Sequence, residues 1–287
     1  MANPNAYEGA LNAGDSLCRH WPEYLMEAGE AGCYLFSACA LATLLWHPAS
    51  PLQTYLRNDA MRRMLMGGGM GATVILIVLS PWGKQSGAHF NPAVTLAFCR
   101  LGKVTSWDAL FYCASQLVGA VAGVALVTLV LWGAPAHNAV RYSATLPGTY
   151  GDWAAFLAEV AVSFLLMMTV LVASNHRVLA SYTRYFAALL IASGIAFESP
   201  LSGMSANPAR TFGPAVCGGY WQSLWIYLTA PTLGMLSAGE VFLRARNGKG
   251  PFCAKLDHRN DKRCIFCHSE ADPSATDASR SQCVKKQ

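Results

Sequence analysis

Charged residues are scarce in this chain. Asp, Glu, Lys and Arg make up 13% of its 287 residues, about half of the ~25% that is usual in soluble domains. Residues 109–134 contain no charged side chain, and residues 153–175 and 220–243 contain one glutamate each. Because about 20 apolar residues form a helix that crosses a bilayer, these three stretches exclude a soluble globular protein and predict a polytopic membrane protein.

The sequence also lacks the usual marks of an enzyme or of a secreted protein. It contains no nucleotide-binding loop, no catalytic triad and no pair of acids at a plausible working distance. Residues 1–22 are polar and lack the apolar central region of a cleavable signal peptide. We therefore expect neither catalysis nor nucleic-acid binding, and we expect the first membrane span to act as the insertion signal.

Three weaker apolar stretches complete the set of spans. Residues 24–46 form one if Glu27 and Glu30 are accommodated, and residues 64–82 open on LMGGGMG, a run of small residues that lets helices approach closely. The stretch at about 181–200 is short and has to be extended at both ends. The prediction is an all-α membrane protein with six transmembrane helices.

One ten-residue pattern occurs twice, as SGAHFNPAVT at 86–95 and as SGMSANPART at 202–211. Each copy follows the second of three spans, so the chain divides into two three-helix units, residues 24–134 and 153–246, joined by residues 135–152. Three is an odd number, so the second unit enters the membrane upside down. Inverted repeats of this kind place a site at the bilayer midplane.

Each pattern also predicts the start of a short helix. Asparagine is a preferred helix N-cap and proline a preferred first helical residue, and the apolar stretch that follows is too short to cross the membrane. Two re-entrant half-helices therefore present their N-termini, with unpaired N–H donors and partial positive charge, to one midplane constriction. A neutral molecule with a lone pair, such as water, suits that place, whereas a cation is repelled. The residues that build the constriction are Asn91, Pro92, Ala93, Asn207, Pro208 and Ala209.

The repeated pattern, the six spans and a glutamate early in each unit (Glu27 and Glu159) resemble the aquaporin, or major intrinsic protein, family over residues 24–246. The resemblance implies a right-handed six-helix bundle with two re-entrant half-helices, assembled as a homotetramer with one pore per subunit, and we expect a bacterial-type member. It also implies that both glutamates accept hydrogen bonds from the loops before the asparagines. His89 would brace the first loop or contribute a carbonyl group to the file of water.

Arg210 stands where the first repeat has Val94. A guanidinium at that depth is costly unless it lines an aqueous path, where it offers donors to a solute and a barrier to cations and protons. The selectivity filter that the resemblance implies consists of Met70, Ile195, Met204 and Arg210, with Met66 or Gly71 as alternatives to Met70. This set lacks the histidine of strict water pores and the aromatic wall that is typical of glycerol facilitators.

We therefore predict a passive water channel that excludes protons and ions, with small neutral solutes as possible further permeants. The alternative is a facilitator of glycerol or other small neutral solutes. Lysine and arginine are more frequent in the segments assigned to one side of the bilayer, which places both termini, residues 1–23 and 247–287, in the cytoplasm.

The C-terminal tail carries a separate pattern. Cys264-Ile-Phe-Cys267-His268 matches the attachment site of haem c, but the expected cytoplasmic location and the shortness of the tail argue against haem. Four soft ligands with CxxC spacing suit zinc, namely Cys253, His258, Cys264 and Cys267, with His268 as an alternative to one of them. We expect no other cofactor; the remaining interpretations are a reduced, unliganded tail and a membrane-anchored metal or redox sensor. Residues 268–287 are expected to be disordered.

Overall fold

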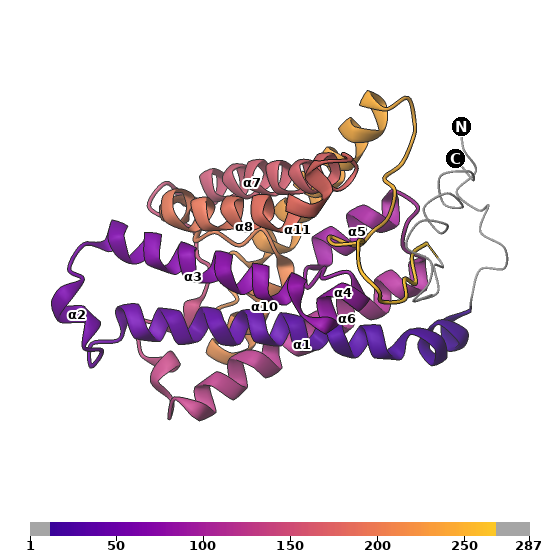
Figure 1. Ribbon diagram of the computed structural model, residues 1–287. Helices are drawn as coiled ribbons and strands as arrows, with labels where there is room; N and C mark the ends of the chain where they lie inside the picture. Colours follow the sequence, from indigo (N-terminus) through magenta and orange to yellow (C-terminus); the bar gives the residue numbers. More distant parts are fainter. Residues whose placement is uncertain (1–11, 268–287) are drawn as a thin grey trace.

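The computed structural model of this protein describes residues 12–267 (Figure 1). Within this range the regular secondary structure is helical, and no β-strand is formed. Six segments are long and apolar enough to cross a membrane, which confirms the predicted all-α fold with six spans. They are Ala13–Trp46 (α1), Asp59–Leu79 (α3), Ser106–Val130 (α6), Gly151–Ser174 (α7), Leu179–Ser202 and Leu224–Ala245 (α11).

The fifth span is assembled from several short helices. It comprises a 3-10 turn (η3, Leu179–Tyr182), α8 (Thr183–Ser193), a π-helical turn (η4, Gly194–Glu198) and α9 (Ser199–Ser202). A π-helical turn inserts one extra residue into a helix and often marks a functional site. The uncharged stretch in the sequence is short because the span contains Arg184 and Glu198.

The connections contain the remaining helices. Short ones are α2 (Leu52–Tyr55), α4 (Pro81–Ser86), η1 (Ala134–Ala136) and η2 (Arg141–Ser143). The two half-helices are α5 (Pro92–Arg100) and α10 (Pro208–Gly218). Each begins at the proline that follows an asparagine. The asparagine Oδ1 accepts the N–H of the alanine two positions later at 2.9 Å, in both helices, as an N-cap does.

Corresponding helices of the two units cross at a glycine. A methyl group added at Gly119 of α6 would lie 2.0 Å from the carbonyl oxygen of Ala28 in α1, and one at Gly234 of α11 would lie 2.4 Å from that of Val160 in α7. The first and third spans of each unit are therefore in backbone contact, which only a residue without a side chain allows. These contacts fix the framework between which the half-helices lie.

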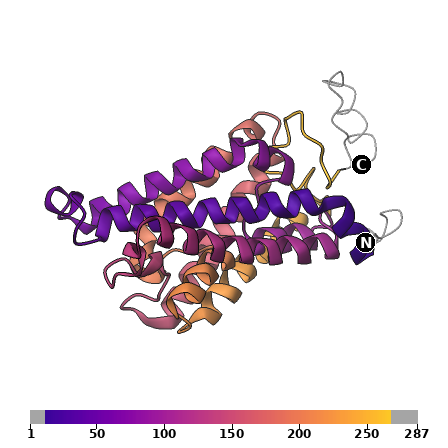
Figure 2. The same ribbon diagram turned by 90° about the horizontal axis from the view of Figure 1, so that it is seen from below.

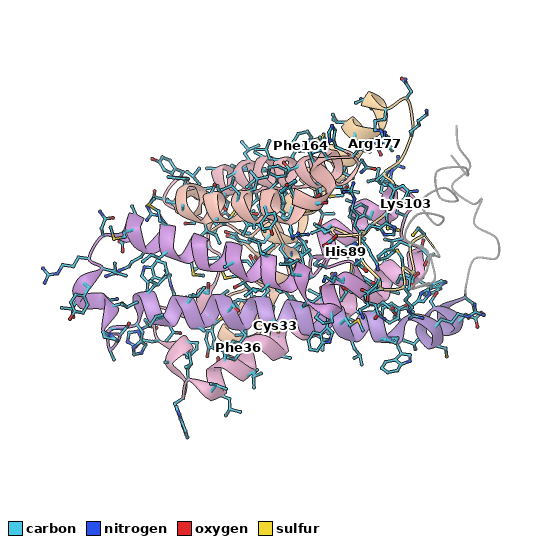
Figure 3. The ribbon with its side chains drawn as sticks, viewed as in Figure 1. Cys33, Phe36, His89, Lys103, Phe164 and Arg177 are labelled. Carbon is cyan, nitrogen blue, oxygen red and sulfur yellow. The ribbon has the colours of Figure 1, made fainter. Side chains whose placement is uncertain are left out.

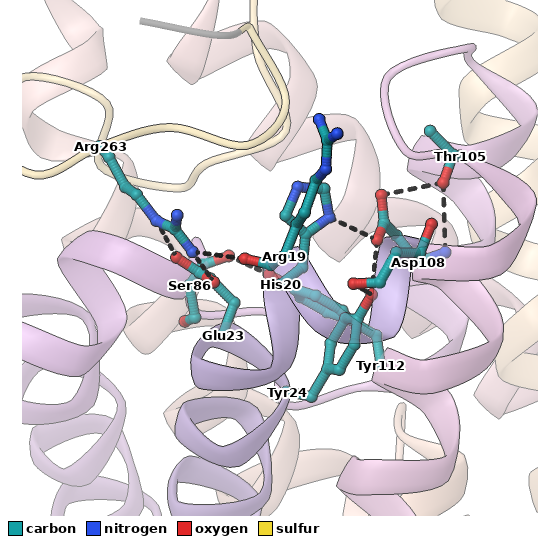
Figure 4. Close-up of polar contacts among 10 residues, drawn as sticks. Arg19, His20, Glu23, Tyr24, Ser86, Thr105, Asp108, Tyr112 and Arg263 are labelled. Atoms are coloured by element: carbon teal, nitrogen blue, oxygen red, sulfur yellow. Dashed lines mark hydrogen bonds and ion pairs between the residues drawn. The ribbon is translucent and has the colours of Figure 1, made fainter. Parts of the chain in front are cut away.

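The first helix begins earlier than the sequence suggests. We expected the span to start near Tyr24, but α1 begins at Ala13, with Asn12 as its N-cap. The polar turns are held against α6, because His20 Nδ1 lies 2.8 Å and the Tyr24 hydroxyl 2.6 Å from Asp108 Oδ1 (Figure 4). The helix therefore continues beyond its apolar part through side-chain contacts that hydropathy does not report.

The tail segment, residues 251–267, returns to the bundle after α11. In Figures 1 and 2 it lies at the end of the bundle where α1 begins. Arg263 forms an ion pair of 2.6 Å with Glu23 of α1, which fixes this placement. The predicted disorder of residues 268–287 lies outside the described residues.

Candidate functional site

The two half-helix tips lie against one another inside the bundle. The side-chain amide of Asn91 donates to the carbonyl oxygen of Ala206 at 2.8 Å, and the amide of Asn207 donates to that of Phe90 at 2.9 Å. Each asparagine therefore caps its own helix through Oδ1 and holds the opposite loop through Nδ2. An amide group carries two N–H donors, so each asparagine has a second donor besides the one that holds the loop.

Two buried glutamates hold the loops that lead to these tips. We call residues 86–91 the first loop and residues 202–207 the second loop. Glu27 accepts the backbone N–H groups of His89 and Phe90 at 2.9 and 2.6 Å. Glu159 accepts those of Ser205 and Ala206, both at 2.7 Å. A carboxylate inside a helical bundle needs such donors, and the hydrogen bonds that the resemblance implies are present in both loops.

The loops need this support because their backbone is strained. Ala88 and Phe90 in the first loop have φ values of 57° and 33°, and Met204 and Ala206 in the second have 52° and 49°. Non-glycine residues rarely adopt this left-handed region, and they keep it only where surrounding contacts over-determine the backbone. The glutamate bonds provide those contacts.

A tyrosine braces each loop from the third span of its unit, and the sequence analysis missed both. The hydroxyl of Tyr112 donates to the carbonyl oxygen of Ser86 at 2.8 Å, and that of Tyr227 donates to Ser202 at 2.6 Å. The tyrosines follow their serines by 26 and 25 residues. Aligning the two repeats beyond the ten-residue pattern would have revealed the pair.

His89 braces the first loop. Its side chain is labelled in Figure 3. The Nε2 atom lies 2.8 Å from the carbonyl oxygen of Ala254 in the tail segment, and the Nδ1 atom lies 3.0 Å from the Thr95 hydroxyl. A carbonyl oxygen only accepts, so Nε2 carries the hydrogen and Nδ1 accepts from Thr95. The imidazole therefore ties α5 to the tail, and its exposed fraction is 1%.

Arg210 is buried at the second tip, with 7% of its surface exposed. Its guanidinium donates to the carbonyl oxygen of Ser143 at 2.7 Å and to the Ser143 hydroxyl at 3.4 Å. A guanidinium has five N–H donors in a fixed plane. The two bonds to Ser143 orient the group, and its other N–H donors are available for further hydrogen bonds. Ser143 lies in η2, within the stretch that we had assigned only as a connecting loop, and no sequence signal singled it out.

Met204 meets the π-helical turn of the fifth span. A methyl group added at Gly194 would lie 2.7 Å from the Met204 sulfur, so Gly194 leaves room for that side chain. Ile195, the predicted filter residue of this span, is the next residue and is buried. Gly194 is a contributor to this region that the sequence analysis missed.

Met70, the predicted filter residue of the second span, is a buried residue of α3. α3 packs against η4, and Met66 and Met70 are both buried on one face of α3. Gly71, the other alternative for the filter, faces α8, where an added methyl group would lie 3.1 Å from the carbonyl oxygen of Ala188. Gly71 is thus packed against α8, and the assignment of Met70, with Met66 as its alternative, to the filter remains a prediction.

The tail ligands also converge. The ligand atoms of Cys253, His258, Cys264 and Cys267 all lie within 4.8 Å of one another. His268, the last residue of the haem-like pattern, lies outside the described residues.

Lys255, which lies between Cys253 and His258 in the sequence, is buried, and burial lowers the pKa of its ammonium group. Its Nζ donates to the carbonyl oxygens of Lys84 and Arg263 at 2.8 and 2.6 Å.

Comparison with known proteins places this geometry in a family. The sequence profile described as "Major intrinsic protein" matches residues 18–242. Aquaporin NIP1-1 of Oryza sativa subsp. japonica is 32% identical over 196 residues, which cover 65% of this chain and 67% of that protein. Aquaporin NIP3-1 of Arabidopsis thaliana is 31% identical over 210 residues, which cover 67% and 65%. The matched region thus spans about two thirds of each relative's length.

A solved structure supports the fold independently of these sequences. The X-ray structure of the aquaglyceroporin from Plasmodium falciparum superposes with a TM-score of 0.65 and covers 78% of this chain and 95% of its own. The two sequences are 21% identical, so this likeness bears on the fold alone. The expectation of a bacterial-type member remains a prediction.

Proposed function

Because the chain belongs to the major intrinsic protein family, we propose that it is a passive transmembrane water channel that excludes protons and ions. The observation that carries this proposal is the junction of the two half-helix tips, where Asn91 and Asn207 each bond to the opposite loop. Two helix N-termini and two spare amide donors meet at one place inside an apolar bundle.

This junction selects for a neutral acceptor. A water molecule that passes it accepts hydrogen bonds through its oxygen, so both of its own hydrogens point away from the donors. A proton cannot then be relayed across that water, and the partial positive charge of the helix N-termini opposes cations. Arg210 adds a full positive charge on one side of the junction, which strengthens the barrier.

A facilitator of glycerol or other small neutral solutes is the second candidate. The observation that favours it is the composition of the predicted filter, in which Met70, Ile195 and Met204 are apolar and buried and Gly194 lacks a side chain. Methionine side chains are flexible and adapt to their contacts. Such a filter admits solutes that a histidine-lined constriction would reject.

We also propose that the subunits form a homotetramer and that both termini are cytoplasmic. The tetramer is supported by the family to which the chain belongs. The orientation is supported by the distribution of Lys and Arg. Both ends of the described chain lie at the same end of the bundle, since Arg263 near one end binds Glu23 near the other.

Stopped-flow light scattering of proteoliposomes tests the function. A sucrose gradient measures water permeability, and glycerol and urea gradients measure solute entry, for the wild type and for Arg210→Val, which copies Val94 of the first repeat. We expect water permeability above that of empty liposomes. Proton leak, followed separately with a pH-sensitive dye inside the liposomes, should rise several-fold in the variant. If the proton leak and the solute selectivity of the variant match those of the wild type, Arg210 is not part of the selectivity filter.

A further inference from the structure

The four ligand atoms of the tail segment are arranged as in a metal site. Cys253 Sγ and Cys264 Sγ are 3.4 Å apart, and Cys267 Sγ is 3.7 Å from His258 Nε2. In a tetrahedral zinc site, bonds of about 2.0–2.3 Å place neighbouring ligand atoms ~3.5–3.8 Å apart. Three thiols and one imidazole close the coordination shell, as in structural rather than catalytic zinc sites.

The segment that carries these ligands has little else to fold it. Residues 251–267 contain turns and bends but neither helix nor strand. Three side chains of this segment, Cys253, Cys264 and Phe266, are nevertheless buried, with exposed fractions of 4% or less. Short loops of this kind commonly obtain their folding free energy from a metal ion.

The ligands are interleaved with the residues that contact the first loop. Ala254, next to Cys253, accepts a hydrogen bond from His89 at 2.8 Å. Phe266, next to Cys267, stacks on the His89 ring with a centroid distance of 5.5 Å and an interplanar angle of 8°. Fixing the sulfur atoms therefore also fixes the contacts with His89.

The backbone of the tail segment reaches the same loop. The N–H of Leu256 donates to the carbonyl oxygen of Gly87 at 3.1 Å. Gly87 itself is closely covered, because a methyl group added there would lie 3.0 Å from the Phe266 ring. The tail segment thus contacts the chain four residues before Asn91.

The segment is anchored to both repeats. On the first repeat, Arg263 pairs with Glu23 of α1 at 2.6 Å. On the second, Asp257 pairs with Arg184 of α8 at 2.9 Å, and the N–H of Phe252 donates to Asn175 Oδ1. The segment therefore bridges the two repeats at one end of the bundle, beside the loop that leads to Asn91.

We propose that Cys253, His258, Cys264 and Cys267 bind a zinc ion, and that the zinc-bound tail segment is a plug that constricts the pore mouth next to His89 and lowers water flow without abolishing it. The plug rests on the proposed channel function, whereas the metal site does not. Each coordinating thiol releases its proton to solvent when zinc binds. Loss of zinc would free the segment from His89 and Gly87 and open that mouth.

Metal analysis of the purified full-length protein tests the first half. We expect one zinc ion per chain in the wild type, and a cobalt-substituted form that shows the absorption band of thiolate coordination. Cys264→Ser should lose the band and most of the zinc. Cys18→Ser, which removes an exposed thiol of α1, should keep both. A wild type that binds neither zinc nor cobalt overturns the metal site.

Water permeability of the same preparations tests the second half. Protein stripped of zinc before reconstitution should conduct several-fold more water than the zinc-loaded protein, and added zinc should restore the low value. Cys264→Ser should be open with or without zinc, and Cys18→Ser should behave as the wild type. Arg263→Ala, which removes the anchor on Glu23 but no ligand, should retain zinc and still conduct more.

The outcomes separate the two proposals. Zinc binding with equal permeability in the loaded and stripped states overturns the plug and leaves the channel standing. Permeability no higher than that of empty liposomes in both the stripped wild type and Cys264→Ser overturns the channel, while the measured metal site stands. Low permeability when loaded and high permeability when stripped supports both.

Discussion

The first and second loops have the same framework but different surroundings. In both, a glutamate accepts two backbone N–H groups, a tyrosine hydroxyl holds the serine carbonyl group, and an asparagine reaches the opposite loop. The equivalence of these bonds shows what the duplicated pattern preserves. It preserves a strained loop, the bonds that hold it, and the asparagine at the tip of each half-helix.

The surroundings differ at the two mouths. The carbonyl oxygen of Gly87 accepts the N–H of Leu256, whereas no backbone N–H among residues 12–267 donates to the equivalent Gly203. The second loop instead lies beside Arg210, which is fixed to Ser143. The second loop is also covered, since a methyl group added at Gly203 would lie 3.0 Å from the backbone nitrogen of Leu146. The second mouth is therefore distinguished by the permanent charge of Arg210, and the first by a cover that contains the four candidate metal ligands. The proposed selectivity filter at Arg210 and the proposed plug next to His89 therefore lie at opposite ends of the junction between the half-helix tips.

The glutamates also differ in their side-chain partners. The Ser202 hydroxyl donates to Glu159 at 2.6 Å, but the equivalent Ser86 donates to Glu30 at 2.7 Å. Glu27 instead accepts the side-chain amide of Gln116 at 2.6 Å. Four residues after the bracing tyrosine, the first repeat has this glutamine and the second has Pro231, which has no donor. The second loop therefore depends more completely on one carboxylate.

Removing that carboxylate should have the largest effect. Glu159→Ala leaves the N–H groups of Ser205 and Ala206 without their acceptor inside the bundle. An unsatisfied buried donor costs about 1–3 kcal/mol, so the free energy of unfolding should fall by about 2–6 kcal/mol. Thermal unfolding in detergent, followed by circular dichroism, measures the change.

Glu240→Ala is the matched control for this change. Glu240 pairs with Arg100 at 2.6 Å, but the two side chains are 38% and 59% exposed, and an ion pair open to solvent contributes about 0–1 kcal/mol. If Glu159→Ala unfolds at the same temperature as this control, the glutamate bonds do not hold the second loop.

The helix crossings offer a second way to separate the repeats. Gly119→Ala would place a methyl group 2.0 Å from a backbone oxygen and Gly234→Ala one at 2.4 Å, so both helices must shift. Overpacking costs about 1–3 kcal/mol, and the closer crossing of the first repeat should cost more. Gly68→Ala, which meets nothing within 4 Å, should not destabilise the protein. Equal melting temperatures for all three variants would contradict the close crossings.

The sequence predicted the parts of this site that follow local rules. Asparagine followed by proline specifies a capped helix start, and two copies of that signal predicted both half-helices and the position of Arg210. The contacts of Ser143 and of the two tyrosines depend on where separate helices meet. His89 and Ala254 are 165 positions apart, so no local pattern could indicate that the tail covers the first loop.

The start of α1 illustrates the same limit. Hydropathy indicates where a helix can be in lipid, but residues before Tyr24 are helical because His20 and Tyr24 bind Asp108 of α6. Similarly, the offset from Asn207 led to Ile195, whereas Gly194 is the residue that makes room for Met204. The π-helical turn changes which side chains face the interior, and its position is not encoded in a short motif.

Filling that space should narrow the filter. In Gly194→Ala the new methyl group would lie 2.6 Å from the terminal carbon of Met204, which is flexible and can move toward the path. We expect glycerol and urea permeability to fall several-fold and water permeability to fall less. Solute-uptake measurements on proteoliposomes test this, with Gly68→Ala as a control on the outward face of α3. Unchanged glycerol-to-water selectivity would exclude Gly194 and Met204 from the narrowest part.

The smallest expected effect compares the two bracing tyrosines directly. Tyr227→Phe and Tyr112→Phe each remove one hydroxyl that donates to a serine carbonyl oxygen, at 2.6 and 2.8 Å, and leave the ring in place. A hydrogen bond of this kind contributes about 0.5–1.5 kcal/mol, so both variants should lower the unfolding temperature slightly and by similar amounts. Permeability should change little, because the glutamates still hold the loops. If one variant lowers the unfolding temperature much more than the other, the two loops are not held by equivalent bonds. One loop then depends on its tyrosine and the other on different contacts.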